Sequence, residues 1–155
     1  MISIRAYDSD DLDACVEILH YAFLHFNRSD ILPEKRENFI AFFDFQKNRE
    51  QLSAFFLHPE KVLVAVSEGQ VIGVLRASEG RIQSLFVHHQ WHRQGIAQSL
   101  VKSYEEIVKQ QGKKVITVLA SSYAERFYEK IGFYRQGERF LKNETVWVQP
   151  MKKIL

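Results

Sequence analysis

The segment 84–100, SLFVHHQWHRQGIAQSL, holds the residue types best suited to binding a phosphate. An apolar run passes through a short polar loop directly into a helical pattern, and such a helix start offers unpaired N–H groups and the positive end of the helix dipole. Gly95 and the small Ala97 leave room for a phosphate near the backbone, and Arg93 adds a fixed positive charge. These residues predict a phosphate or diphosphate site, with an ordinary strand-to-helix turn as the alternative.

Two common phosphate-binding motifs do not fit this loop. The Gly-Lys-Ser/Thr ending of a Walker A sequence is absent, and the loop lacks the three glycines of a dinucleotide fingerprint. The spacing 88–92, HHQWH, has two histidines four residues apart as in zinc helices. However, the central Glu is missing and the segment precedes the helix, so we expect no metal site.

Hydrophobic periodicity and turn residues outline the elements that position this loop. They predict strands at 2–7, 81–88, 115–120, 133–140 and 145–151, and two more within 61–78 that are joined by a turn at 67–70. Helical regions are predicted at 8–26, after Pro33, at 95–111 and at 122–132. A capping box at 122–125 is expected to open the last helix. The expected order is β-α-α-β-β-β-α-β-α-β-β, an α/β protein in one domain spanning 1–155.

Two motifs together resemble a known family. The stretch 92–97, HRQGIA, is similar to the Gln/Arg-x-x-Gly-x-Gly/Ala signature of the GCN5-related N-acetyltransferase (GNAT) superfamily, with His92 where Gln or Arg is usual. The second stretch, 121–133 (SSYAERFYEKIGF), is similar to that family's x-x-x-Ala-x-x-Phe-Tyr-x-x-x-Gly-Phe pattern. The resemblance spans nearly the whole chain and is closest to small uncharacterised bacterial acetyltransferases.

The resemblance implies a mixed sheet, and it implies acetyl-CoA as the acetyl donor. Two parallel strands, 81–88 and 115–120, would splay apart so that the pantetheine arm pairs with the backbone between them, and the diphosphate would sit on the amides of 93–98. The cofactor-binding residues implied in this way are Leu85, Phe86, Val87, His92, Arg93, Gln94, Gly95, Ile96, Ala97, Gln98, Ser121, Ala124 and Phe127.

Tyr128 matches the family's general acid, which protonates the departing coenzyme A thiolate after direct attack by a deprotonated amine. A phenol, with a pKa near 10, is a suitable donor. The alternative is that Tyr128 only packs in the helix core. The general base is open between Glu79, His88 and a water held by Gln83 or Ser84.

Composition limits the remaining classes of function. The apolar fraction of 46% and a single cysteine describe a globular chain without a disulfide framework, and Cys15, among apolar residues at helical spacing, is expected to be core. No window is long and apolar enough for a membrane span, so we expect a cytoplasmic protein with no membrane partner. The lysine pairs 113–114 and 152–153 lack aromatic neighbours, so no nucleic-acid partner is expected.

Charge is unevenly distributed along the chain. Residues 1–80 carry 8 Lys and Arg against 13 Asp and Glu, and residues 81–155 carry 13 against 6, giving −5 and +7. This polarity suggests a cationic amine entering opposite an anionic cofactor. The leading hypothesis is therefore an N-acetyltransferase acting on a small-molecule or peptide amine, and the alternative is a non-catalytic coenzyme A sensor of the same fold.

Acceptor specificity is expected to lie in residues 20–57 and 134–145. The phenylalanine-rich stretch 39–56 is interpreted as core, with an acceptor-site wall or a homodimer surface as alternatives.

Overall fold

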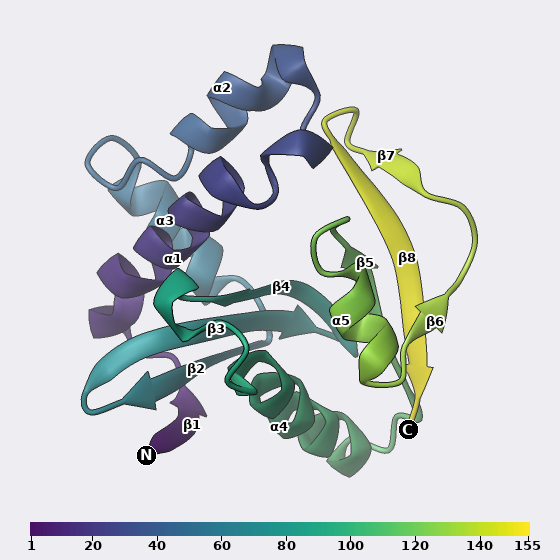
Figure 1. Cartoon of the computed structure of the whole chain (residues 1–155). Coiled ribbons are helices and arrows are strands. Elements are labelled where there is room, and N and C mark those ends of the chain that lie inside the picture. Colours follow the sequence, from purple (N-terminus) through teal and green to yellow (C-terminus); the bar gives the residue numbers. More distant parts are fainter.

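An eight-stranded mixed sheet is the centre of the computed structural model, which describes residues 1–155 (Figure 1). The strands are β1 (Ile2–Ala6), β2 (Lys61–Ser67), β3 (Gln70–Ser78), β4 (Arg81–Val87), β5 (Val115–Ala120), β6 (Tyr134–Arg135), β7 (Phe140–Lys142) and β8 (Val146–Ile154). Their order is β1-β2-β3-β4-β5-β8-β6, with β7 paired to another part of β8. All neighbours are antiparallel except β4 and β5. The predicted mixed α/β fold is confirmed.

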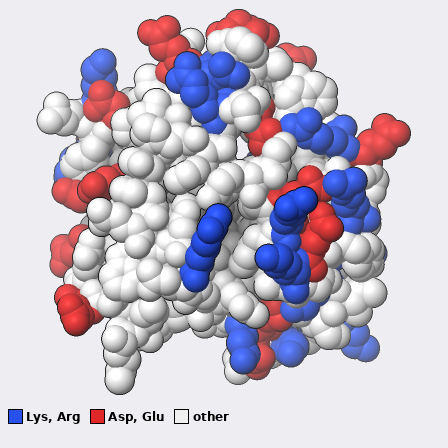
Figure 2. All heavy atoms as spheres, in the orientation of Figure 1, with Lys and Arg blue, Asp and Glu red and all other residues white.

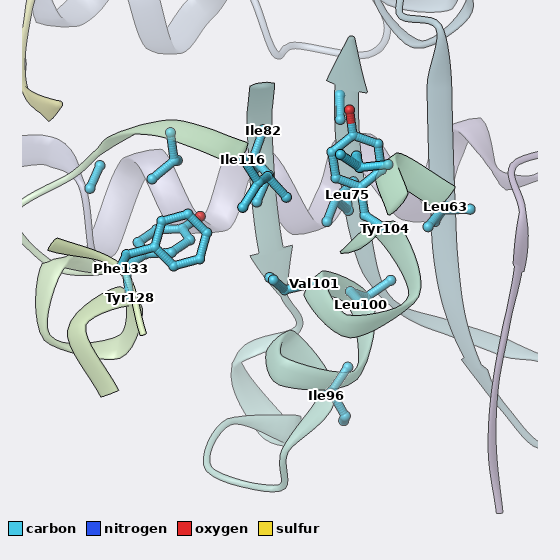
Figure 3. Packing of buried hydrophobic residues seen from close by; sticks show 14 of the residues in the cluster. Leu63, Leu75, Ile82, Ile96, Leu100, Val101, Tyr104, Ile116, Tyr128 and Phe133 are labelled. Atoms are coloured by element: carbon cyan, nitrogen blue, oxygen red, sulfur yellow. The ribbon is translucent and has the colours of Figure 1, made fainter. Parts of the chain in front are cut away.

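Helices cover both faces of the sheet (Figure 1). They are α1 (Leu12–His25), α2 (Pro33–Ala41), α3 (Arg49–Leu57), α4 (Ile96–Gln110) and α5 (Glu125–Lys130), with short 3-10 turns η1 (Ser9–Asp11), η2 (Arg28–Asp30) and η3 (His89–Trp91). One apolar cluster joins the sheet to α4 and α5 and includes Leu100 and Tyr104 (Figure 3). A second cluster, which includes Leu19 and Phe56, joins the opposite face to α1 and α3. Burial on both faces explains why the strands read as long apolar runs.

The first helix starts as its acidic residues predict. The Asp8 carboxylate accepts from Asp10 N at 2.9 Å, and the Asp11 carboxylate accepts from Asp8 N at 2.8 Å, so the two form a reciprocal capping box. The Arg5 guanidinium also bonds Asp11 and holds the pKa of that carboxyl below its usual value. These acids therefore serve the start of η1 and α1.

Two elements differ from the sequence-based outline. The helical region after Pro33 is divided into α2 and α3, because Asp44 accepts from Gln46 N and Asn48 donates to the carbonyls that end α2. The strand predicted at 133–140 is interrupted into β6 and β7, and Gly137 between them has a φ of +82°. The predicted turn at 142–144 is present, with Asn143 and Glu144 both at positive φ.

The charge split of the sequence is visible on the surface. On the face drawn in Figure 2, most Lys and Arg side chains lie over the part that holds α5, β6 and β8, with acidic side chains among them. Acidic side chains are more frequent along the opposite margin. None of the helices combines the length and the apolar character that crossing a bilayer requires.

Cys15 is fully enclosed between α1 and the sheet, as predicted for a core residue (0% exposed). Burial raises the pKa of its thiol from 9.0 to about 12. Between those two pH values the unfolded chain releases a proton that the folded chain keeps, so the folded state loses stability as pH rises.

Cys15→Ala should therefore flatten the alkaline fall in stability. Losing one titrating thiol removes a slope of about 1.4 kcal/mol per pH unit between pH 9 and 12. Urea unfolding at pH 8 and at pH 10.5 measures this slope, while the packing loss appears equally at both pH values. Parallel curves for the two proteins would show that Cys15 does not titrate differently on folding.

Candidate functional site

Strands β4 and β5 separate after a short parallel contact. They pair only at Arg81 with Thr117 and at Ile82 with Val118. On the other edge of β4, Ser84 pairs with Arg76 while Ile82 pairs with Ala77, so Gln83 is an extra, bulged residue. A bulge bends its strand and ends regular pairing. The predicted splaying of the two strands is therefore present and begins at Gln83.

The separated edge of β4 carries free backbone groups. The His88 N–H donates to the Ile72 carbonyl on β3 at 2.8 Å. Because such bonds alternate along an antiparallel ladder, Leu85 and Val87 turn their backbone groups toward the gap, whereas Phe86 turns its own toward β3. The expectation that Phe86 offers its backbone to a ligand is thus corrected, since β3 already uses those groups. Leu85 and Val87 keep that role as a prediction.

The loop after β4 presents a row of unpaired amides. The first backbone bond at this end of α4 runs from Ser99 N to Gly95 O at 3.0 Å, and no backbone N–H from Arg93 to Gln98 has an acceptor in the protein. Gly95 is in the left-handed region at φ +78°, with open space where a Cβ would stand. Arg93 also has a positive φ, of 63°, and its side chain is exposed. This geometry suits an anion held by backbone donors.

The histidines of the 88–92 segment have separate partners. His88 Nδ1 accepts from Gln90 N at 3.1 Å, and His89 stacks on Tyr21 with ring centroids 3.9 Å apart. His92 Nε2 lies 2.9 Å from the Val87 carbonyl, which makes that nitrogen the donor. His92 therefore binds the open edge of β4, at the family position that is usually Gln or Arg.

A cavity of about 630 Å³ occupies the gap between β4 and β5 and continues under α1, α2 and α3. Its lining includes five of the predicted site residues, namely Leu85, Phe86, Ser121, Ala124 and Tyr128. Val87, Phe127 and the 92–98 loop do not line it. The phenylalanine-rich stretch turns out to be both core and wall, because Phe43 is buried and its ring, with those of Phe39, Phe42 and Phe55, lines the cavity.

Tyr128 is packed in the core, with its hydroxyl free. Its ring contacts Phe127 and Phe133 edge-on and is 3% exposed (Figure 3). The hydroxyl has no hydrogen-bond partner in the protein. It is nevertheless not completely buried, because the one completely buried side-chain N or O atom that lacks a partner is Arg36 Nε. Burial raises the pKa of Tyr128 above its ordinary value of 10.0. The phenol therefore remains protonated, and Tyr128 is one of the residues that line the cavity.

The start of α5 differs from the predicted capping box. The Ser122 hydroxyl donates to Asp30 Oδ1 at 2.7 Å instead of capping the helix, and Ser122 N donates to Asp30 Oδ2 at 2.8 Å. Ser121 Oγ accepts from Ala124 N at 3.1 Å in the turn that precedes α5, whose own first residue has no side-chain cap. Ser122 bonds Asp30 and does not cap the helix, because the Asp30 carboxylate is buried and requires hydrogen-bond donors. The loop before α5 is thereby tied to η2.

Sequence reasoning missed a group of cations at the cavity. Arg76, Arg81 and Lys142 line it, and none of them forms an ion pair. Asp30 is the one acidic residue of the lining, and Arg139 already pairs with it at 2.8 Å. The expected acidic entrance for a cationic amine is therefore absent from this cavity. The position of Arg76 inside the otherwise apolar strand 70–78 is the one feature of the sequence that indicates a buried cation.

The candidates for a general base are also narrowed. Glu79 and His88 do not line the cavity, whereas Gln83 and Ser84 do. The Ser84 hydroxyl accepts from Arg76 Nη1 at 2.9 Å. The cavity thus offers no free carboxylate or imidazole as a general base. Of the candidates predicted from the sequence, only a water held by Gln83 or Ser84 lies at the cavity.

Comparisons with known proteins give a consistent picture. A sequence model described as an acetyltransferase (GNAT) domain matches residues 28–155. The Escherichia coli (strain K12) protein called uncharacterized N-acetyltransferase YafP is 30% identical over 91 residues, a match that covers 59% of this chain and 57% of that protein. The chain therefore aligns with little more than half of that relative.

Solved structures share the fold at low sequence identity. A GCN5-related N-acetyltransferase from Rhodopseudomonas palustris superposes with a TM-score of 0.83 at 20% identity, covering 99% of this chain and 95% of that one. The PaiA N-acetyltransferase from Thermoplasma acidophilum, solved in complex with coenzyme A, gives a TM-score of 0.76 at 18% identity, covering 100% of this chain and 99% of that one.

Proposed function

Because the chain belongs to the GNAT acetyltransferase family, we propose that it transfers the acetyl group of acetyl-CoA directly to a primary amine of a small molecule or peptide. The observation that carries this proposal is the row of unpaired amides from Arg93 to Gln98 beside the gap between β4 and β5. Backbone donors at a helix start match a diphosphate, and the gap matches an extended arm of amides. The complex of PaiA with coenzyme A supports the choice of donor.

The residues that would hold acetyl-CoA follow from this geometry. The diphosphate would accept from the amides of 93–98, with the Arg93 guanidinium beside it. The pantetheine amides would pair with Leu85 and Val87, which turn their backbone groups toward the gap. His92 would have to release the Val87 carbonyl for that pairing.

The reaction needs one proton donor and one free amine. The deprotonated acceptor nitrogen attacks the thioester carbon, the carbon–sulfur bond breaks, and Tyr128 gives its proton to the leaving sulfur. The proton released from the nitrogen passes to water, and the phenolate recovers a proton from solvent. The free hydroxyl supports its role as the acid, and the raised pKa of Tyr128 keeps that hydroxyl protonated before the transfer. Since no carboxylate in the cavity is free, we propose that a water at Gln83 or Ser84 accepts the amine proton.

A thiol-release assay tests this function. The protein should release coenzyme A from acetyl-CoA in the presence of at least one amine from a panel of amino acids, peptides, polyamines and aminoglycosides, and mass spectrometry should find the acetylated product. Calorimetric binding of coenzyme A without release on any acceptor would instead establish the sensor. A cytoplasmic location and a homodimer stay predictions.

A further inference from the structure

Arg76 is an unusual residue for the middle of a sheet. It lies on β3, is 8% exposed and lines the cavity on the side of α3. Its guanidinium stacks on the Phe55 ring at 3.3 Å, and Nε donates to the Phe55 carbonyl at 3.2 Å. Nη1 donates to Ser84. Burial lowers the pKa of Arg76 to about 10, but all its partners are neutral. A buried charge without a counterion is costly, so such a group marks a place for an anion.

The guanidinium still has donors available. Arg76 Nη2 has no hydrogen-bond partner in the protein. It is also not completely buried, because the one completely buried side-chain N or O atom that lacks a partner is Arg36 Nε. Stacking on Phe55 and the two bonds made by Nε and Nη1 fix the plane of the guanidinium. A fixed guanidinium edge open to a cavity is well suited to a carboxylate.

Two further cations strengthen the field at this end of the cavity. Arg81 and Lys142 line it, and the pKa of Lys142 is lowered by burial and then by the charges of Arg81 and Arg76. Asp30, the one acidic residue of the lining, is already paired with Arg139. Ser84, the partner of Arg76 on β4, precedes the end of that strand by roughly 10 Å, and Arg81 precedes it by roughly 20 Å, at the usual rise per residue. The amide row lies beyond that end, and the Arg76 guanidinium is fixed at Phe55 and Ser84, so the diphosphate is too far away to pair with it.

The rest of the wall is aromatic. The rings of Phe39, Phe42, Phe43, Phe55 and Trp147 line the same cavity. An occupant of this part of the cavity must combine an anionic group for the cations with an apolar body for the rings.

Resting on the function proposed above, we propose that the acceptor is an amino-acid-like amine whose carboxylate binds Arg76 and whose apolar side chain lies among the phenylalanines. The guanidinium anchors the carboxylate, so that the amine of the same molecule is held at the thioester. The nearby cations also disfavour the protonated form of that amine. They therefore increase the fraction of deprotonated amine in a cavity that has no free carboxylate to accept its proton.

Matched acceptors test this substrate class. Leucine and leucinamide, and phenylalanine and phenylalaninamide, differ only in the carboxylate, and rates are compared at equal concentrations of free amine. We expect kcat/KM to be about tenfold or more higher for the carboxylate member of each pair. Equal rates for both members, or a polyamine as the best acceptor, would overturn the inference while leaving the acetyltransferase proposal intact. Absence of thiol release with every acceptor would instead remove the proposed function.

Substitutions of Arg76 and Lys142 test whether these cations cause the preference for a carboxylate on the acceptor. Arg76→Gln should raise the KM for leucine about tenfold and bring the leucine-to-leucinamide ratio near one, with the KM for acetyl-CoA unchanged. Arg76→Lys, which keeps the charge, should restore part of the ratio. Lys142→Met changes a side chain at the rim that is only partly covered, and it should lower the same ratio about threefold even if Arg76→Gln fails to fold. A uniform loss with every acceptor would place Arg76 on the donor and contradict the proposal.

Discussion

Tyr128→Phe is expected to lower kcat by at least about tenfold, within the range of about 10² to 10⁴ that a positioned acid contributes, while coenzyme A affinity stays within a few-fold. The substitution removes only a hydroxyl that has no partner in the protein, so neither the packing against Phe133 nor the cavity walls change. Steady-state kinetics and calorimetric titration with coenzyme A measure the two quantities. Because burial raises the pKa of Tyr128, the wild-type acid should also remain loaded above pH 10.

Tyr104→Phe is the matched control for this experiment. Tyr104 belongs to the same apolar cluster (Figure 3), but its hydroxyl accepts from Gly80 N at 3.0 Å, and Tyr104 is not among the residues that line the cavity. Its loss should cost about 1 kcal/mol or more of stability and leave turnover unchanged. Unchanged turnover in Tyr128→Phe would assign that tyrosine to packing alone.

Gly95→Glu should weaken coenzyme A binding about 100-fold or more. The glutamate would place a negative charge at the amide row that is proposed to hold the diphosphate, and it would force a residue with a side chain into the left-handed conformation at φ +78°. In the variant the free loop relaxes out of this conformation and must regain it on binding, which costs about 1–2 kcal/mol, and charge repulsion supplies the remainder. Calorimetry with coenzyme A at two salt concentrations measures both parts.

Gly95→Ala separates strain from charge. Open space surrounds the position that its Cβ would take, so this variant carries the backbone strain without the negative charge. It should weaken binding by about tenfold, with little dependence on salt. Tight binding by Gly95→Glu would remove the amide row from the proposed site, and equal losses in both variants would remove the electrostatic argument.

Local patterns predicted much of the fold and part of the site. The polar loop before a helix, with Gly95 at its start, predicted an anion site from residues within one turn of each other, because helix ends and left-handed glycines are local properties. The same holds for the hairpin at 67–70, where Glu68 and Gly69 both have positive φ. The division of the region after Pro33 was missed because Asn48 bonds carbonyls six and seven residues away.

Contacts between distant segments decided the remainder. Ser122 leaves its predicted capping role for Asp30, which is 92 residues away in the chain. The bulge at Gln83 arises from how β3 and β4 pair, and alternation along that ladder, rather than sequence, turns the Phe86 backbone away from the gap.

The sequence by itself determined the mixed fold, the loop before α4 and the place of Tyr128 on α5, because periodicity, glycine positions and helix ends act over a few residues. Only the tertiary structure decided the charge and shape of the cavity. Arg76, Arg81 and Lys142 meet there because the sheet and the β7–β8 hairpin bring three separate segments together, and net charge along a chain does not report such a meeting.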